Sequence, residues 1–592
     1  MKNLPNIIKQ FSPRSFLILL TTGIIMVSLL LTVNSRKARA AVTVSLWSTY
    51  EIILTSQTNY TNAYKNEVDL KATFTGPGGI SKTISGFWEG GATFKIRFTP
   101  TIQGDWSYRT SSTKDASLNG RTDIITVIAP TSGNHGFVRR DTANSYSFKW
   151  DDGTRYFMWG QTYYEIIRNA MANGGTNTAW KTAIDNTKSY GINKVRMLLY
   201  PWPGLSSDNP YPDSQPFIGS STIPDHDTLN LTHWQKLDEI IKYLESKEMV
   251  ADIILFADAP RVFGSQIQDE RYLKYALARF SAYHNVIWCV TNEWNYTNKS
   301  QSYWDGIGSI VSDNDPWLIE GSDRRALSIH QQTREDFQFF GSSWPTHAII
   351  QYGVRNGKGY TNGDQWGNYG ITASSNHTYN IPVVNDEYGY IGDVNGNIMV
   401  TSSAQQRRIM WGIATGGGYG STGDIRTNNG KPIFTADWKD AIDSIGANYY
   451  ADIKRFLDLW TTKGISYWKM SGENTIVKSG NRVYVLSNPG QEYIIYAAAG
   501  GSFSLSLSSG SYNVTRFSPR ASCGSSSDPC ETSLGTVSGG STNISFSMPD
   551  SNDWVIYIKK SVTTKQIILN WLSEIFDING DGKVNSLDFA SP

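Results

Sequence analysis

The 592-residue sequence predicts a multidomain protein: a (β/α)8 barrel of the TIM type, flanked by two β-sandwich domains and followed by a short EF-hand-like tail. Three observations predict this fold. Short runs of alternating polarity, separated by Gly- and Pro-bearing turns, fill residues 41–130. Strand-like and helix-like segments alternate over residues 136–470. Short strands then return over residues 474–560, with no helical periodicity between them.

The first 40 residues have the pattern of an export signal. Basic residues precede an apolar stretch at 16–33, and Ala38-Arg39-Ala40 supplies small residues at the spacing of a signal-peptidase site. We therefore expect residues 1–40 to be a signal peptide and the protein to be secreted or held at the cell surface. A membrane is a partner only if this segment stays uncleaved, because 16–33 is close to the ~18 residues that span a bilayer.

The N-terminal domain is predicted from alternation. Residues 68–74 and 92–98 place apolar side chains at every second position, which suits strands with one buried face. The turn Gly76-Pro77-Gly78-Gly79 separates such runs. A small antiparallel sandwich over 41–130 follows from this pattern.

Eight strand-like runs predict the barrel. Helical segments with apolar residues at three- and four-residue spacing lie between them, for example at 233–245 and 269–283. Because parallel barrel strands are buried on both faces, we expect continuous apolar runs rather than alternation. The predicted strands lie near 156–160, 192–200, 249–256, 286–290, 326–329, 346–352, 382–385 and 417–422.

Charge and cysteine content limit the possible partners. A formal net charge of +1 argues against an electrostatic nucleic-acid partner. Aromatic residues make up 13% of the chain, an excess that suits sugar-binding faces as well as β-rich cores. Cys289 lies within a predicted buried strand and is expected to be a free, inert thiol. Cys523 and Cys530 bracket a Gly/Ser/Asp/Pro loop, where we expect a local disulfide that fits an exported protein.

Two of the predicted barrel strands end in carboxylates. Glu293 follows the strand at 286–290, and Glu387 follows the strand at 382–385. Active sites of such barrels lie at the carboxyl ends of the strands, and paired carboxylates cleave glycosidic bonds. A structural carboxylate at a strand-to-loop junction is the other interpretation of each residue, and Asp386 is an equally acidic neighbour of Glu387. The pair together favours the catalytic interpretation, with O-glycosidic bonds of a polysaccharide or oligosaccharide as substrate.

Other side chains near the predicted strand ends are candidate substrate-binding residues. Asn292 could hydrogen-bond a sugar hydroxyl, and Arg196 could keep Glu387 ionised or form an ordinary ion pair. Tyr352 could donate its phenol to the nucleophile. Three aromatic residues either stack on sugars or belong to the core, namely Trp202, Trp344 and Trp411. His330, Gln161 and Trp294 complete the candidates around the mouth.

These motifs resemble those of known families. Asn292-Glu293 after the fourth strand and Glu387 after the seventh look like the retaining glycosidases of clan A, which implies acid/base and nucleophile roles respectively. That mechanism expects carboxyl groups about 5–5.5 Å apart. The runs 159–163, 416–420 and 512–520 resemble the apiosidase-like barrels and the β-sandwich after them, which is sometimes labelled collagen-binding. At Thr291-Asn292-Glu293 the chain departs from that group's Gly-Gly-Asp, and this departure favours the clan A pair.

The tail at 566–592 carries the spacing of a calcium loop. Oxygen-bearing groups fall at EF-hand positions 1, 3, 5, 7, 9 and 12, and Gly582 stands at position 6. The segment resembles one dockerin repeat, which implies a structural calcium ion and a cohesin-like partner. A polar linker is the other interpretation. The predicted ligands are Asp577, Asn579, Asp581, the carbonyl of Lys583, Asn585 and Asp588.

The first hypothesis is thus a secreted retaining glycoside hydrolase that needs no cofactor for catalysis. The alternative is a non-catalytic carbohydrate-binding surface protein. The presence of both carboxylates favours the enzyme. A metal-dependent hydrolase on the same barrel would need clustered His and Asp ligands, and the seven histidines show no ligand-spaced pair.

Overall fold

The structure, a computed structural model, describes residues 42–202, 214–220, 223–332, 336–352, 370, 373–391, 402–424, 426–428, 431–433 and 448–561. The predicted signal peptide at 1–40 and the predicted calcium loop at 566–592 lie outside the described residues. No helix among those described has the length and apolar character needed to cross a membrane.

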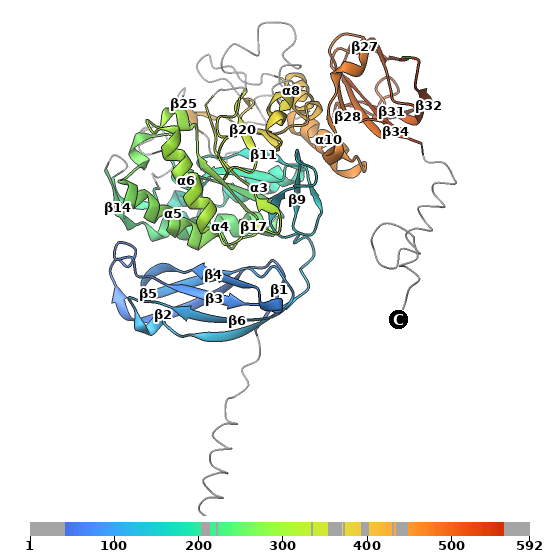
Figure 1. The fold of residues 1–592 in the computed structure, drawn as a ribbon. Coiled ribbons are helices and arrows are strands. Elements are labelled where there is room, and N and C mark those ends of the chain that lie inside the picture. The colour runs from blue at the N-terminus through green and yellow to red at the C-terminus, as the bar shows by residue number, and fades with distance from the viewer. Residues whose placement is uncertain are drawn as a thin grey trace, which may run out of the picture.

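The N-terminal domain contains two antiparallel-rich sheets and lies below the barrel in Figure 1. Along β6 inward and outward side chains alternate, as the periodicity predicts. Phe74 of β3 stacks on Phe98 of β5 with ring centroids 3.9 Å apart, so the core lies between the sheets. One sheet has the order β1-β7-β6-β3-β4 and the other pairs β2 with β5. The strands are β1 (Val42–Ser45), β2 (Tyr50–Tyr60), β3 (Lys71–Thr75), β4 (Ser81–Ser85), β5 (Phe87–Phe98), β6 (Gly104–Ser111) and β7 (Thr122–Ile128).

Eight parallel strands form the near-closed barrel, which confirms the predicted fold of the central region. The two ends of this sheet approach each other where the Thr346 amide donates to the Leu327 carbonyl at 2.9 Å. In spatial order the strands are β19 (Leu327–Ser328), β16 (Val286–Thr291), β15 (Val250–Phe256), β12 (Lys194–Leu198), β11 (Trp159–Thr162), β23 (Tyr419–Asp424), β21 (Val383–Asn385) and β20 (Ala348–Ile350), with β22 (Tyr390–Ile391) beside β23.

Amphipathic helices surround the barrel, and the two that we predicted are α4 and α5. Between β19 and β20 the described residues contain no helix. The helices are α2 (Ile166–Gly175), α3 (Ala179–Ser189), α4 (Leu231–Ser246), α5 (Gln266–Phe280), α6 (Gln301–Asn314), α8 (Ser403–Thr415) and α10 (Asn448–Thr462). Two hairpins extend from the loops, β13 (Phe217–Ser220) with β14 (Ile223–Leu229) and β24 (Arg426–Asn428) with β25 (Lys431–Ile433).

A small five-stranded sheet adjoins the barrel, and the sequence did not predict it. Its strands contain only two or three residues, too few to show a period. Arg139 and Arg140 pair with Arg325 and Arg324, which joins segments far apart in the sequence. The order is β10 (Arg155–Tyr156), β9 (Phe148–Trp150), β8 (Val138–Arg140), β18 (Asp323–Arg325) and β17 (Ile319–Glu320).

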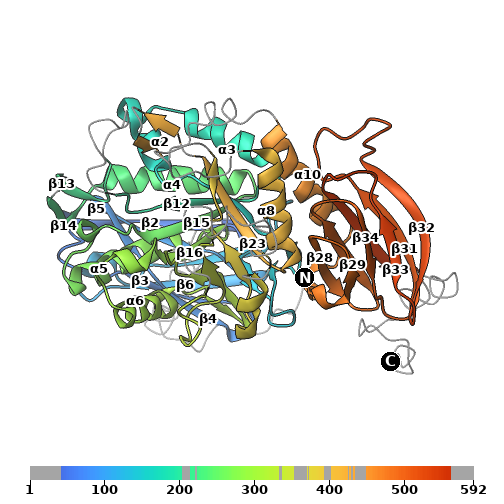
Figure 2. The ribbon, with the colours of Figure 1, turned by 90° about the horizontal axis from the view of Figure 1, so that it is seen from above.

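The C-terminal domain contains a six-stranded sheet and a three-stranded sheet. Alternate residues of β29 enter different cores: Ile494 and Tyr496 join the cluster shared with the barrel, whereas Tyr493 and Ile495 join the domain's own cluster. Figure 2 shows α8 and α10 between the barrel and this domain. The strands are β26 (Ser471–Gly472), β27 (Val477–Ser479), β28 (Val483–Asn488), β29 (Glu492–Ala497), β30 (Ser502–Leu505), β31 (Gly510–Phe517), β32 (Glu531–Gly539), β33 (Ile544–Ser547) and β34 (Trp554–Lys560).

The cysteine predictions are confirmed. Cys523 and Cys530 form a disulfide with their Cα atoms 4.9 Å apart. Cys289 is free and fully buried in β16, and burial raises the pKa of its thiol far above the usual value. A thiol held in that state is unreactive.

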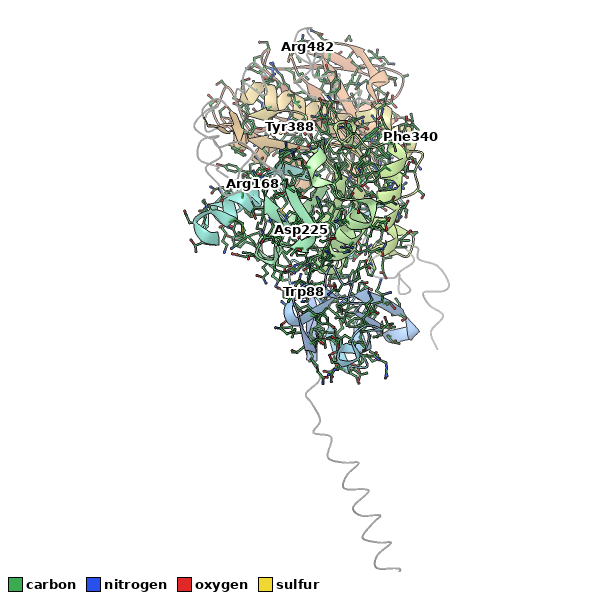
Figure 3. The ribbon with its side chains drawn as sticks, turned by 90° about the vertical axis from the view of Figure 1, so that its left-hand side faces the viewer. Trp88, Arg168, Asp225, Phe340, Tyr388 and Arg482 are labelled. Atoms are coloured by element: carbon green, nitrogen blue, oxygen red, sulfur yellow. A yellow bond between two sulfur atoms is a disulfide. The ribbon has the colours of Figure 1, made fainter. Side chains whose placement is uncertain are left out.

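Buried ion pairs tie the barrel to the N-terminal domain. Arg97 of β5 donates from Nη2 to Asp238 of α4 at 2.9 Å and from Nη1 to the carbonyl of Arg279 at 2.7 Å. Trp88, labelled in Figure 3, lies at the same junction, where its carbonyl accepts from the Tyr275 phenol at 2.8 Å. These contacts lie near the amino ends of the barrel strands, because Arg279 precedes β16.

A second buried group joins the C-terminal domain to the barrel. Arg407 of α8 contacts Asp452 of α10 at 2.7 Å and Asp553 at 2.9 Å. Next to it, Trp411 stacks on Tyr496 with centroids 5.5 Å apart. Trp411 is therefore a core residue of this interface rather than a sugar platform.

Candidate active site

Glu293 and Glu387 lie at the same edge of the barrel. Glu293 follows β16 and Glu387 follows β21, and both strands run parallel in one sheet, so their carboxyl ends share an edge. Glu293 is 6% exposed and has φ of +24°, an unusual backbone conformation for a residue with a side chain. The side chain of Glu387 is 10% exposed. Tyr388, the residue after Glu387, is labelled in Figure 3.

His330 connects the two carboxylate-bearing segments. Its Nδ1 accepts a hydrogen bond from the backbone amide of Glu293 at 3.3 Å, and its Nε2 lies 3.6 Å from Oε2 of Glu387. Burial, with the nearby charge of Arg196, lowers the pKa of His330 well below its usual value, so the imidazole is neutral. Because Nδ1 accepts, the ring proton resides on Nε2 and faces Glu387. The sequence-predicted His330 thus lies between the predicted pair.

Arg196 of β12 holds residues from three strand ends together. Its Nη2 donates to the side-chain oxygen of Asn292 at 2.8 Å, and its Nη1 lies 3.6 Å from Oε2 of Glu387. The same Nη1 donates to the phenol of Tyr164, whose ring lies 5.0 Å from the guanidinium. Arg196 is fully buried. The structure therefore brings the predicted Arg196, Asn292 and Glu387 into one cluster.

Tyr164 contacts Glu387 directly and was not among the candidate residues. Its phenol donates to Oε2 of Glu387 at 2.9 Å and lies 3.3 Å from the side-chain oxygen of Asn292. Tyr352, predicted for this role, is buried beside Asn385, whose side-chain amide donates to the Tyr352 carbonyl at 2.9 Å. A usable signal was present, since Tyr164 closely follows the strand at 159–162.

Gln161 lies deeper than predicted. It is fully buried on β11, and its amide nitrogen is 3.5 Å from the phenol of Tyr450 on α10. The described contacts of Gln161 therefore point to the barrel core rather than to Glu293 or Glu387. Trp344 is likewise buried, against Gly308 of α6.

The structure separates Asp386 from its neighbour Glu387. Asp386 points into the barrel interior, where Lys194 lies 2.7 Å away and the Ser421 hydroxyl donates to it. Burial alone would raise the pKa of Asp386, but the Lys194 and Arg196 cations hold it below its usual value. Burial raises the pKa of Asp252, which lies 2.9 Å from the same ammonium and partly offsets that charge. Asp386 belongs to this internal ion-pair group, which leaves Glu387 as the carboxylate at the mouth.

Aromatic side chains line the same region. Trp294 is half-buried, packs edge-on to Phe339 with centroids 5.3 Å apart, and has a buried indole N–H without a hydrogen-bond partner among the described residues. Trp202 donates to Asp258 at 2.7 Å and packs edge-on to Tyr164 at 5.0 Å. In the part of the chain that the structure describes, no three His, Cys, Asp or Glu side chains gather as metal ligands.

A near-closed parallel barrel carries its active site at the carboxyl edge of the strands, where Glu293 and Glu387 lie. Residues 142–462, more than half of the chain, match the family model described as apiosidase-like, catalytic domain. The chain belongs to this apiosidase-like family. Residues 43–113 match a domain of unknown function, DUF5060. No curated protein sequence matches the chain.

Solved structures share the architecture. A candidate glycoside hydrolase from Bacteroides vulgatus is 25% identical, covers 88% of this chain and all of its own, and has a TM-score of 0.68. A glycoside hydrolase family 5 protein from the same species is 15% identical, with 73% of this chain and 94% of its own covered and a TM-score of 0.56. Another glycoside hydrolase is 14% identical, with 72% and 98% covered and a TM-score of 0.54. The last two comparisons show the fold alone.

Proposed function

We propose that the protein is a retaining glycoside hydrolase that cleaves O-glycosidic bonds of a polysaccharide, with Glu387 as nucleophile and Glu293 as acid/base. The observation that carries the proposal is the set of contacts around His330, which touches Glu387 and the backbone of Glu293 at once. Such a shared neighbour keeps the two segments at a fixed separation across the mouth.

The division of roles rests on the surroundings of Glu387. The guanidinium of Arg196 and the phenol of Tyr164 both approach Oε2, and a positive charge and a hydrogen-bond donor favour an ionised carboxylate. An ionised carboxylate is what a nucleophile requires. Glu293 then takes the complementary role of proton donor.

Two displacements complete the proposed reaction. Glu387 attacks the anomeric carbon, the glycosidic C–O bond breaks, and the leaving oxygen takes the electron pair together with the proton of Glu293. Glu293, now a carboxylate, removes a proton from water as the water oxygen attacks the same carbon and releases Glu387. Bond making and breaking at two inversions retain the configuration.

Asn292 is proposed to bind the sugar next to the cleaved bond. Its oxygen accepts a hydrogen bond from Arg196 at 2.8 Å, and its amide nitrogen donates to Asp258 at 3.2 Å. A side-chain amide has two N–H groups, so one remains for a sugar hydroxyl. The buried indole N–H of Trp294 offers a further donor.

Substitution of each carboxylate tests the assignment. Glu387→Ala is expected to abolish turnover, whereas Glu293→Ala retains activity on aryl glycosides with good leaving groups and is rescued by azide. Glu67→Ala, at an exposed residue of the N-terminal domain, is the matched control. Azide rescue of only the Glu387 variant, with inverted product, would reverse the roles. Binding of polysaccharide without turnover by the parent would support the non-catalytic alternative.

From sequence alone we also propose that the protein is exported or held at the cell surface, because basic residues and an apolar stretch precede Ala38-Arg39-Ala40. The spacing from Asp577 to Asp588 likewise supports one calcium ion in the tail, and with it a cohesin-like partner.

A further inference from the structure

A cavity of about 730 Å³ lies between the N-terminal domain and the barrel. Residues of the loop between β1 and β2, the linker at 131–135, and the end of α4 line it. Asn193 and Asn285, which precede β12 and β16, also line it. These positions are at the amino ends of the barrel strands, so the cavity is at the opposite end of the barrel from Glu293 and Glu387.

Each carboxylate that lines this cavity has a basic neighbour. Glu51 contacts Arg97 at 2.9 Å and Lys95 at 3.1 Å, and Glu248 lies 3.8 Å from Lys188. Glu245 lies 3.1 Å from the imidazole of His284. Because these carboxylates are already engaged, the cavity favours a neutral ligand, since an ion would have to compete with their present neighbours.

Its polar and aromatic groups suit a sugar. Trp150 is half-buried, packs edge-on to Tyr156 at 5.0 Å, and lines the cavity beside His135. An indole face packs against the C–H face of a pyranose, while hydroxyls need donors and acceptors around it. Asn285 is 2% exposed, and its side-chain oxygen has no hydrogen-bond partner among the described residues, although its nitrogen donates to the carbonyls of Ile241 and Met249. A buried acceptor at a cavity wall is costly unless a ligand or water donates to it.

We propose that this cavity is a second carbohydrate-binding site, which takes a short neutral oligosaccharide against Trp150 and hydrogen-bonds it through groups such as the Asn285 oxygen. Its volume is within the range of about 300–1,000 Å³ typical of ligand pockets. The choice of sugar as ligand rests on the proposed glycosidase function. The site would hold polysaccharide on the enzyme without taking part in cleavage.

Two variants test the site in the full chain, one that enlarges the cavity and one that fills it. Trp150→Ala removes the aromatic wall, and Ser246→Trp fills the cavity from the exposed end of α4. Ser189→Trp is the matched control, because Ser189 ends α3, is exposed, and makes the same 2.7 Å bond from its hydroxyl to the carbonyl three residues earlier as Ser246 does. Binding is measured as retardation in native gels that contain galactomannan, arabinoxylan, xyloglucan or mixed-linkage glucan, in a Glu387→Ala background that prevents digestion.

We expect Trp150→Ala and Ser246→Trp to weaken retardation by the preferred polysaccharide about tenfold, and Ser189→Trp to leave it unchanged. With Glu387 restored, all three should cleave an aryl monoglycoside as the parent does. The inference is overturned if none of the four polysaccharides retards the parent, or if both cavity variants are retarded like the control. If the parent shows no glycosidase activity but the two cavity variants still lose retardation, the proposed function is overturned and the second binding site is supported.

Discussion

Tyr164 illustrates how a single residue can set the state of the proposed nucleophile. Its phenol donates to Glu387 at 2.9 Å while accepting from Arg196, so it passes the influence of the buried cation to the carboxylate. From the sequence we predicted a phenol in this role at Tyr352, and we did not predict Tyr164. Both tyrosines closely follow barrel strands, and periodicity alone does not say which phenols turn toward the mouth. Arg196, Asn292 and His330 were predictable because each sits at a strand end as a polar residue in an apolar setting.

Tyr164→Phe should lower kcat on aryl glycosides by about 10–100-fold, equal to about 1.4–2.7 kcal/mol of transition-state stabilisation, with KM little changed. The reason is that the substituted ring keeps its packing but loses the hydrogen bond to Glu387. Tyr163→Phe is the control, since the Tyr163 phenol bonds Thr187 at 2.8 Å away from the site. Equal kcat values for the two variants would argue against a role for Tyr164.

The barrel strands were predictable from the sequence, whereas the small five-stranded sheet was not. Each of the eight predicted strands overlaps an observed strand. Most of them are mainly apolar runs, because barrel strands are buried on both faces, whereas 417–422 was predicted from its position in the alternation of strands and helices. The barrel interior nevertheless contains Lys194, and Gly160 of β11 makes room for it, since a Cβ there would lie 2.7 Å from the lysine side chain. Strands β8 to β10 depend on pairing with β18, a long-range contact that no local pattern records.

Arg97 joins β5 of the N-terminal domain to α4 of the barrel, and its loss should be strongly destabilising. Arg97→Met removes a buried partner of Asp238 and of Glu51, and we expect the free energy of unfolding to fall by about 3 kcal/mol. Urea unfolding followed by tryptophan fluorescence measures the change. The control is Arg109→Met, at an exposed position of β6, which should lower the free energy of unfolding by less than about 0.5 kcal/mol. Comparable losses for both variants would mean that the ion pair does not stabilise the junction.

Considered whole, the molecule buries several histidines in the neutral form. Burial, with the Lys194 charge nearby, lowers the pKa of His347 to about 3, and burial lowers the pKa of His377 to about 4. His330 is shifted in the same direction. In the unfolded chain these groups take up protons below about pH 6.5, whereas the folded chain resists protonation until lower pH. Their stabilising contribution is therefore fully present above pH 6.5 and is lost as pH falls through the window down to about 4–3.

Between pH 6.5 and 5 the free energy of unfolding should decrease by up to about 1.4 kcal/mol per pH unit for each of these three histidines. His347→Gln should reduce that slope by roughly a third, because one titrating group is removed. Denaturant unfolding at a series of pH values gives the slope. Ile124→Gln, at an exposed side chain that carries no titratable group, is the control and should leave the slope unchanged. An unaltered slope in the His347 variant would contradict the assignment.

Because β29 contributes side chains to two cores, the barrel depends on the C-terminal domain to cover part of its surface. A barrel cut off after Lys469 would lose Ile494 and Tyr496, and with them the cover over Trp411 on α8. Arg407 would at the same time lose Asp553, one of its two carboxylate partners. A newly exposed apolar surface of this kind favours self-association. The C-terminal domain thus acts as a solubilising cover for the barrel, and trimming it away would yield aggregates rather than a minimal enzyme.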